Sequence, residues 1–250
     1  MLTVQHVIDI ILEARMHALQ YVPGATLMQA GPIICIHYET PLYWETDAFL
    51  VSEAVDPDTV LATVQAYRPG PHLLAIYTSA PEQLCARWAI RGYKTVAAEP
   101  TEAVMRLPLT QVPQSGWPYP VQVVQTTADV ACYNAEPDGE RMAPEQLHDP
   151  LVRHYYIALD GRVVCQGQAF TSSGRAVYVG GMFTQEAYRR RGLATALMQR
   201  IHTDAATTGI ADSILVALPM GVPLYQRLGY VPVLYVQKFV PNDWRAEASI

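Results

Sequence analysis

The stretch TQEAYRRRGLATAL, residues 184–197, joins a strand-like segment to an amphipathic helical one. We predict a strand over residues 176–183 and a helix over residues 192–208. Backbone N–H groups at the start of a helix have no partner within it, and together with the helix dipole they favour an anion. Gly192 and Ala194 carry little side-chain bulk, so a phosphate can approach the main chain closely. This turn is therefore a candidate phosphate or pyrophosphate site.

Three arginines, Arg189, Arg190 and Arg191, add positive charge beside this turn. An RRRG run alone is more typical of a solvated surface turn, because short motifs match by chance. A second segment, LYQRLGY at residues 224–230, follows later in the chain. The two segments in this order favour a ligand site over a surface turn.

Together, Arg189-x-x-Gly192-x-Ala194 and LYQRLGY resemble the GNAT superfamily, the acetyl-CoA-dependent N-acetyltransferases. The resemblance covers residues 120–240. Thr184 and Glu186 depart from the family pattern, which often has Val and Pro there, but neither change removes a backbone donor. The resemblance implies a mixed α/β (α+β) fold. Its central sheet is mixed, mostly antiparallel, flanked by helices and splayed between two parallel strands, here residues 177–183 and 214–218.

The resemblance also implies site residues. The end of the central strand would line the pantetheine and the thioester of acetyl-CoA through Met182, Phe183 and Thr184. Backbone N–H groups would hold the pyrophosphate at Arg189, Arg190, Arg191, Gly192, Leu193, Ala194 and Thr195. Tyr225 would lie near the sulfur as the catalytic acid, the alternative being a core aromatic residue. The Gly180-Gly181 pair is typical of a bulge or a close backbone approach to a ligand.

The implied reaction is N-acetyl transfer, by direct attack of an amine of a small molecule or peptide on the thioester in a ternary complex, with no metal. No Cys or Ser has an evident paired base, which disfavours an acyl-enzyme, and Cys165 reads as a small core residue. The acidic run Glu136, Asp138 and Glu140 either holds a cationic acceptor or is a solvated loop. The alternative function is a catalytically inactive acyl-CoA-binding or interaction protein of the same fold.

A proline-rich stretch divides the chain, with Pro113, Pro118 and Pro120 inside it. We predict a linker at residues 111–120 between an N-terminal domain, 1–110, and a C-terminal acetyltransferase domain, 121–250. RWAIRGY at residues 87–93 parallels LYQRLGY, which indicates an internal duplication with a degenerate GNAT-like N-terminal half. That half has no Arg-x-x-Gly-x-Ala loop. Its Trp44, Glu45 and Asp47 either face an acceptor or belong to the core.

Hydrophobic patterning and turn residues predict the remaining elements. In the first half we expect helices at residues 4–19, 57–66 and 81–91, and strands at 33–38, 48–53, 72–77, 93–98 and 103–108. In the second half we expect strands at 121–124, 155–159, 163–170 and 214–218, helices at 127–135 and 219–228, and two final short strands within 230–240. Asp160-Gly161 is a hairpin-turn signal, Gly209 is a helix C-cap, and His202 is expected to face solvent.

Composition narrows the partners and the location. The chain has 17 Lys and Arg against 23 Asp and Glu, a net charge of −6, which argues against nucleic-acid binding. Its 4 cysteines form no CxxC pair, so no zinc motif or disulfide framework is evident. No apolar run approaches the ~20 residues of a membrane span, and charges interrupt the N-terminal helix. We therefore expect a cytoplasmic protein with reduced thiols.

Overall fold

The computed structural model describes residues 2–42, 45–67, 71–96, 102–109, 118–173 and 176–244. Its first half contains α1 (Val4–Leu19), β1 (Ala25–Ala30), β2 (Ile33–Leu42), β3 (Glu45–Ser52), α2 (Pro57–Tyr67), β4 (Leu73–Thr78), α3 (Pro81–Ala89), β5 (Tyr93–Thr95) and β6 (Glu102–Pro108). Its second half contains β7 (Gln122–Val123), α4 (Thr127–Tyr133), the 3-10 helices Pro144–His148 and Glu186–Tyr188, β8 (Val152–Leu159), β9 (Arg162–Thr171), β10 (Ala176–Thr184), α5 (Leu193–Thr207), β11 (Asp212–Ala217), α6 (Val222–Arg227) and β12 (Val231–Pro241).

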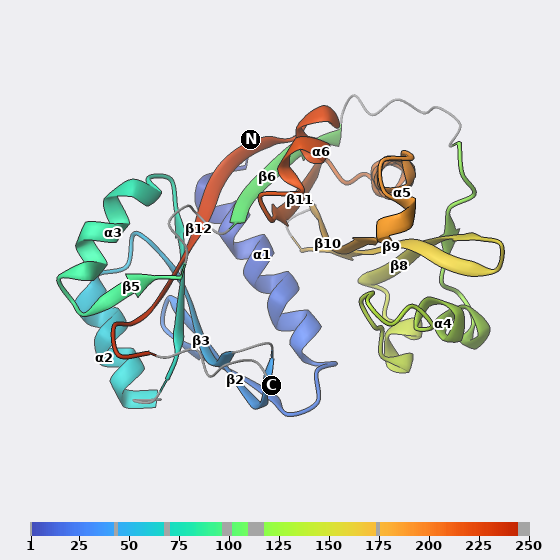
Figure 1. The fold of residues 1–250 in the computed structure, drawn as a ribbon. Helices are drawn as coiled ribbons and strands as arrows, with labels where there is room; N and C mark the ends of the chain where they lie inside the picture. The colour runs from blue at the N-terminus through green and yellow to red at the C-terminus, as the bar shows by residue number, and fades with distance from the viewer. Residues whose placement is uncertain are drawn as a thin grey trace.

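The strands join in one mixed, 12-stranded sheet with helices on both faces (Figure 1). The β3–β4 and β10–β11 pairs are parallel and the other pairs are antiparallel. This confirms the predicted fold class. Local signals account for much of the agreement: Asp160 and Gly161 have φ of 51° and 76°, which two-residue hairpin turns require, and Gly209 follows α5 with φ 82°.

The two halves of the chain exchange strands. The order along the sheet is β1-β2-β3-β4-β12-β6-β11-β10-β9-β8-β7, with β5 also paired to β12. Thus β6 lies between β11 and the first part of β12, whereas the last part of β12 returns to the first half, where Phe239 pairs with Leu74 and with Thr95. Most of the predicted linker, residues 111–117 of 111–120, lies outside the described residues.

Two sequence predictions about the strands are wrong. The expected pair of short strands in residues 230–240 is one strand, β12, because a register shift between Pro232 and Leu234 lets it pass the proline without ending. We also expected no strand at β1, whose residues alternate only weakly between buried and exposed, and which pairs with β2 at the sheet edge. Its strand character comes from pairing rather than from its own sequence pattern.

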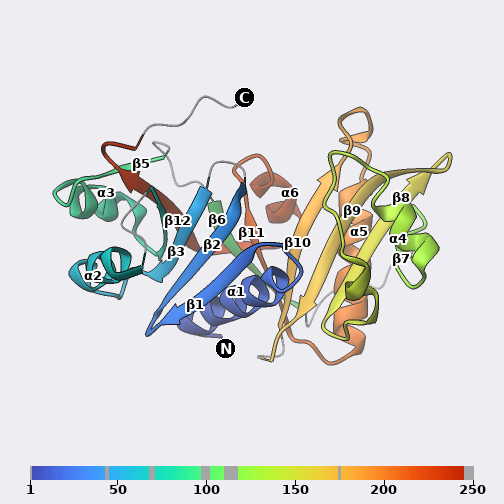
Figure 2. The ribbon, with the colours of Figure 1, turned by 90° about the horizontal axis from the view of Figure 1, so that it is seen from below.

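The two faces of the sheet have separate cores. On one face, Val177 and Val179 of β10 pack in a cluster with α5. On the other, Ala176 and Tyr178 of β10 pack in a cluster with α1, as strand alternation requires. Figure 2 shows α1 crossing the sheet near β1 and β10, and α5 beside β8 and β9. Successive residues of β10 therefore contribute in turn to the core on the α5 side and to the core on the α1 side of the sheet.

His202 does not face solvent, contrary to our expectation. It is 2% exposed, and its Nε2 lies 2.8 Å from the hydroxyl of Tyr230. Burial lowers its pKa to about 4. His154 on β8 is also buried, and its two ring nitrogens have no hydrogen-bond partner among the described residues. Burial lowers the pKa of His154 to about 4 as well, against a smaller opposing influence of Asp149.

These two histidines make the fold acid-sensitive. Their pKa values of about 4 in the folded protein lie below the ordinary 6.5, so the unfolded chain binds more protons between these pH values. The free energy of unfolding should therefore fall as the pH drops from 6.5 towards 4, by about 1 kcal/mol per pH unit for each histidine. Urea unfolding at pH 5 to 7 measures this slope. In His154→Phe the slope should fall to about half, and an unchanged slope would contradict the assignment.

Candidate active site

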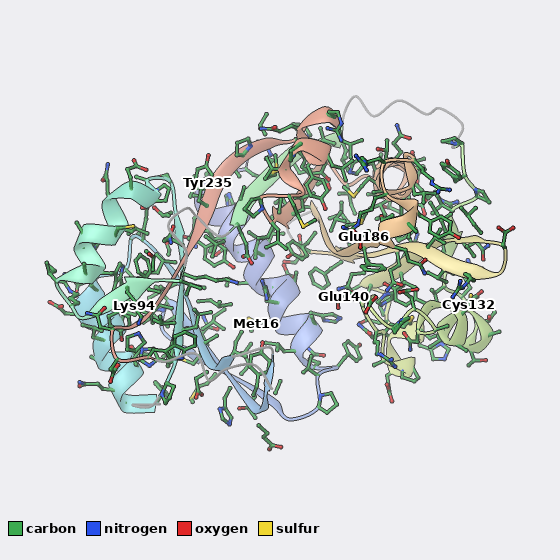
Figure 3. All side chains as sticks on the ribbon, viewed as in Figure 1. Met16, Lys94, Cys132, Glu140, Glu186 and Tyr235 are labelled. Atoms are coloured by element: carbon green, nitrogen blue, oxygen red, sulfur yellow. The ribbon has the colours of Figure 1, made fainter. Side chains whose placement is uncertain are left out.

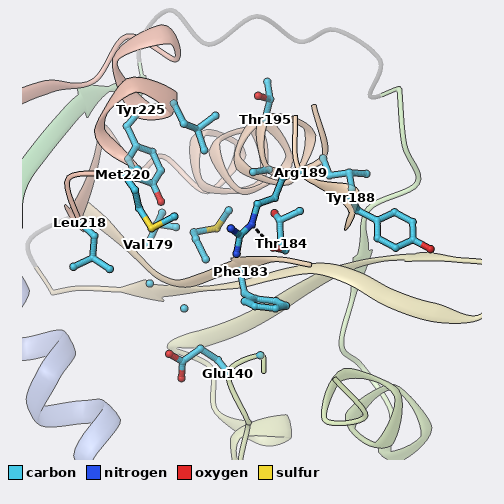
Figure 4. Close-up of a pocket in the computed structure, with 18 of the residues that line it drawn as sticks. Glu140, Val179, Phe183, Thr184, Tyr188, Arg189, Thr195, Leu218, Met220 and Tyr225 are labelled. Atoms are coloured by element: carbon cyan, nitrogen blue, oxygen red, sulfur yellow. Dashed lines mark hydrogen bonds between the residues drawn. The ribbon is translucent and has the colours of Figure 1, made fainter. Parts of the chain in front are cut away.

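A cavity of about 950 Å³ opens between β10 and β11 (Figure 4). Its walls come from a loop after α4, the end of β10, the turn into α5, the end of β11 and α6. The lining residues include Asp138, Gly139, Glu140, Val179, Gly180, Gly181, Met182, Phe183, Thr184, Tyr188, Arg189, Arg190, Gly192, Leu193, Ala194, Thr195, Val216, Leu218, Met220, Leu224 and Tyr225. This volume is within the range of small-molecule and cofactor sites.

The cavity exists because β10 and β11 diverge. They pair in parallel only from Ala176 with Asp212 to Val179 with Leu215, although both strands continue beyond. The divergence begins at Gly180-Gly181, where the pairing of β10 with β9 shifts register before Phe183 and Gly181 adopts φ 58°. Meanwhile β11 stays paired with β6 as far as Ala217. The predicted splay and the predicted bulge are both present.

The turn into α5 presents unpaired backbone donors to this cavity. The first intrahelical bond runs from the Ala196 N–H to the Gly192 carbonyl, which leaves the N–H groups of residues 193–195 without helical acceptors. Within the described part of the chain, no acceptor takes a hydrogen bond from the N–H groups of residues 190–195. Gly192 has φ 83°, and a Cβ there would meet no atom within 4 Å. At this turn the cavity wall is therefore formed by accessible main chain, and the unpaired N–H groups and the dipole of α5 make the electrostatic potential there positive.

The three arginines have different surroundings. The Nε of Arg189 donates to the Thr184 carbonyl over 3.1 Å, a bond drawn in Figure 4, and its side chain lines the cavity. Arg190 also lines the cavity and adopts φ 61°. Arg191 lies outside the lining. Its guanidinium sits 5.0 Å from the ring centroid of Tyr188 and donates to the Ala187 carbonyl over 3.0 Å, so it braces the turn.

Tyr225 projects from α6 into the cavity, from the α5 side of β10 (Figure 4). It is 8% exposed, and its ring packs edge-on against Tyr230 at 5.8 Å. Burial raises the pKa of Tyr225 to about 12, with smaller contributions from Tyr178 and Cys165. The hydroxyl therefore keeps its proton at neutral pH and can donate a hydrogen bond.

The acidic loop divides into structural and exposed carboxylates. Glu136 is buried and accepts a hydrogen bond from the Gln185 side chain, so it braces the loop against the turn. Asp138 and Glu140 line the cavity. Glu140 packs so closely on Gly181 that an added Cβ there would lie 2.9 Å from its Cγ. Figure 4 shows Glu140 on the side of β10 opposite to Tyr225.

The structure brings nearly all the predicted site residues to one cavity. These are Met182, Phe183, Thr184, Arg189, Arg190, Gly192, Leu193, Ala194, Thr195 and Tyr225. The apolar wall formed by Leu218, Met220 and Leu224 was not predicted, because its only sequence signal is its position between a strand and a short helix. Trp44 lies outside the described residues, and Asp47 is buried beside His37, at 2.8 Å, in the first half.

The polar chemistry of the cavity comes from a small set of groups. The described residues contain no cluster of three or more His, Cys, Asp or Glu side chains placed to hold a metal ion. None of their helices is both long and apolar enough to cross a membrane. The polar groups of the cavity that a bound molecule would meet thus include main-chain N–H groups, the side chains of Arg189 and Arg190, the Tyr225 hydroxyl and the two exposed carboxylates.

Comparison with known proteins shows which family and which solved structures the chain resembles. Residues 152–232 match the family model of the acetyltransferase (GNAT) domain. The whole chain is similar to a GCN5-related N-acetyltransferase from Kribbella flavida, with TM-score 0.66 and 19% identity over 93% of this chain and 96% of that one. It is also similar to a GCN5-related N-acetyltransferase from Sphaerobacter thermophilus, with TM-score 0.59 and 15% identity over 90% and 84% of the two chains. No curated protein matches it in sequence.

The family match contains β8 to α6, and with them the diverging strands, the turn into α5 and Tyr225. The structural likenesses extend over most of the chain, so the fold they share includes the first half as well. Residues 152–232 therefore match the acetyltransferase (GNAT) domain in sequence, and the chain has the fold of the GNAT proteins named above.

Proposed function

We propose that this protein transfers an acetyl group from acetyl-CoA to an amine of a small molecule or peptide, by direct attack in a ternary complex. One observation carries the proposal: the turn into α5, whose N–H groups are unpaired, and Tyr225 line the same cavity. The first group suits a pyrophosphate and the second suits a leaving sulfur. The N-terminal half, residues 1–110, supports this site through β6, which holds β11 in place.

The proposed cofactor contacts follow the walls of the cavity. Main-chain groups of Met182, Phe183 and Thr184 lie on the stretch of β10 that has separated from β11, where a pantetheine arm can pair with the free strand edge. The N–H groups of the turn, flanked by Arg189 and Arg190, hold the pyrophosphate. No side chain of this chain needs to bond covalently to the acetyl group.

The transfer balances simply. A bond forms between the amine nitrogen and the acetyl carbon, the carbon–sulfur bond breaks, the nitrogen loses one proton and the sulfur gains one. A strand N–H near Phe183 stabilises charge on the carbonyl oxygen. The pKa of Tyr225, about 12, exceeds the ~8.5 of an ordinary thiol, so Tyr225 stabilises the departing sulfur chiefly by donating a hydrogen bond.

Amine-dependent thiol release tests the proposal. Acetyl-CoA is incubated with the protein and with a panel of amines, free thiol is followed, and acetylated amine is quantified by mass spectrometry. We expect thiol and acetylated amine in equal amounts, and only background thiol release without amine. Saturable acetyl-CoA binding with no turnover on a broad panel would instead support a catalytically inactive acyl-CoA-binding protein.

A further inference from the structure

Arg15 lies on the buried face of α1 and is nevertheless exposed to solvent. It follows Ile8 and Ile11 at helical spacing, and these residues are 2% and 0% exposed. The same face packs against the sheet through residues that include Ala14. Arg15 thus combines a core-facing position in the helical pattern with an exposed, charged side chain.

The sheet places polar side chains opposite Arg15. On β10, Tyr178 belongs to the cluster that faces α1, and so does Tyr77 on β4. Glu102 on β6 and Lys238 on β12 each lie two positions from a residue of this cluster, and therefore on the same face of the sheet. They form an ion pair of 3.1 Å. Arg106, on the same face of β6, is paired with Asp212 at 2.7 Å.

Arg15 differs from these two cations, because no carboxylate within the described ranges lies at ion-pair distance from it. Arginine keeps its charge at any ordinary pH. Arg15 is therefore a permanent, solvent-exposed charge without an ion-pair partner among the described residues.

This region adjoins the catalytic cavity through the splay. Gly180 lines the cavity, and a Cβ there would lie 3.3 Å from the Tyr178 ring. Val216 lines the cavity and packs with the α1-side cluster, whereas Val179 lines it from the α5-side core. The cavity therefore reaches both faces of the sheet at the point where the strands part.

Glu140 stands on the same side as Arg15. Figure 4 shows it across β10 from Tyr225, on the side of the sheet where α1 packs, and Figure 3 labels it together with Met16 of α1. Its carboxylate is exposed at the cavity wall. An arginine on α1 and a carboxylate on the cavity wall thus lie on the face of the sheet that Tyr225 and the α5 turn do not occupy.

From this arrangement we propose that the acceptor is an amino-carboxylate, whose carboxylate binds Arg15 while its amine lies beside Glu140 at the splay. The inference rests on the proposed acetyl transfer and specifies its second substrate. A guanidinium can bind a carboxylate through two parallel hydrogen bonds, which adds geometric specificity to the charge attraction. α1, from the half of the chain that lacks the phosphate-binding turn, thereby contributes to substrate selection.

Matched pairs of amines test the inference. Glycine, β-alanine, 4-aminobutanoate and 6-aminohexanoate are compared with alkylamines of equal length that lack the carboxylate. At the best length, we expect kcat/KM to be at least about tenfold higher for the amino acid. Arg15→Met should remove this preference and leave the alkylamine rate unchanged, and Arg15→Lys should restore part of it. Arg162→Met, which removes an exposed arginine from the β9 end of a hairpin, is the control and should keep the preference.

Acetyl-CoA binding, measured by calorimetry on each protein, separates the two proposals. If the unaltered protein binds acetyl-CoA but acetylates alkylamines as well as amino acids, or acetylates no amino acid, the amino-carboxylate inference is overturned and the cofactor site stands. If Arg15→Met keeps the preference, the carboxylate is bound elsewhere and the inference is also overturned. If the unaltered protein does not bind acetyl-CoA, the proposed function itself fails.

Discussion

Replacing Gly192 with glutamate is expected to weaken acetyl-CoA binding by about 100-fold, which corresponds to about 3 kcal/mol. The unpaired N–H groups of residues 190–195 and the dipole of α5 favour negative charge at this point of the cavity. Because a Cβ at Gly192 would point into open space, the new carboxylate would extend into the cavity without displacing protein atoms. It would occupy the place proposed for the pyrophosphate and repel it. Calorimetry gives the change in Kd directly.

The same helix offers a matched control. Gly209, just beyond the other end of α5, has φ 82° against 83° at Gly192, and a Cβ there also meets no atom within 4 Å. Gly209→Glu therefore imposes the same left-handed strain, about 1–2 kcal/mol, and adds the same charge outside the cavity. Both variants should lose similar stability, and only Gly192→Glu should lose binding. Wild-type affinity in Gly192→Glu would show that the pyrophosphate lies elsewhere.

Tyr225→Phe is expected to lower kcat by about 100-fold, the effect typical of losing one hydrogen-bond donor to a developing charge. The ring is kept, so packing against Tyr230 and the affinity for acetyl-CoA should change little. Because burial raises the pKa of Tyr225 to about 12, the hydroxyl stays protonated below about pH 11. The wild-type rate should therefore show no alkaline loss from this group between pH 8 and 10. Steady-state kinetics across this range measures both effects.

Tyr230→Phe is the companion variant for that experiment. The Tyr230 hydroxyl contacts His202 at 2.8 Å and Ser213 at 2.5 Å, away from the cavity lining. Its removal should lower the melting temperature, because it leaves two buried polar groups without this partner, and should spare kcat. A normal kcat in Tyr225→Phe would contradict the role assigned to Tyr225. So would a loss of wild-type rate between pH 8 and 10 that is absent from Tyr225→Phe.

Features encoded by nearby residues were predictable, and features that depend on distant pairing were not. The turn at residues 184–197 carries its own signals, and α1 was predicted with the bounds that the structure has. His202 was misjudged because α5 is buried over a wider stripe than Leu193, Leu197 and Ile201 alone define, and because its partner Tyr230 lies far along the chain. The hydrophobic pattern of β6 and of β12 predicts that each is a strand, but it does not indicate which strands of the other half each will pair with.

Charged side chains show the same division. Glu136 and Glu140 belong to one acidic run, and only the fold separates the carboxylate that braces the loop from the one on the cavity wall. Arg15 carried a readable signal, since a cation stands at an apolar position of the α1 pattern. Its meaning depends on Tyr178 and Glu102, which reach it only once the sheet has assembled.

The reciprocal crossing of β6 and β12 makes the two halves mechanically interdependent. One wall of the reaction chamber, β11, is held by a strand from the half that has no phosphate-binding turn of its own. A substitution in the first half that shifts β6 should therefore also shift β11 and change the shape of the cavity, even where the substituted residue does not line it.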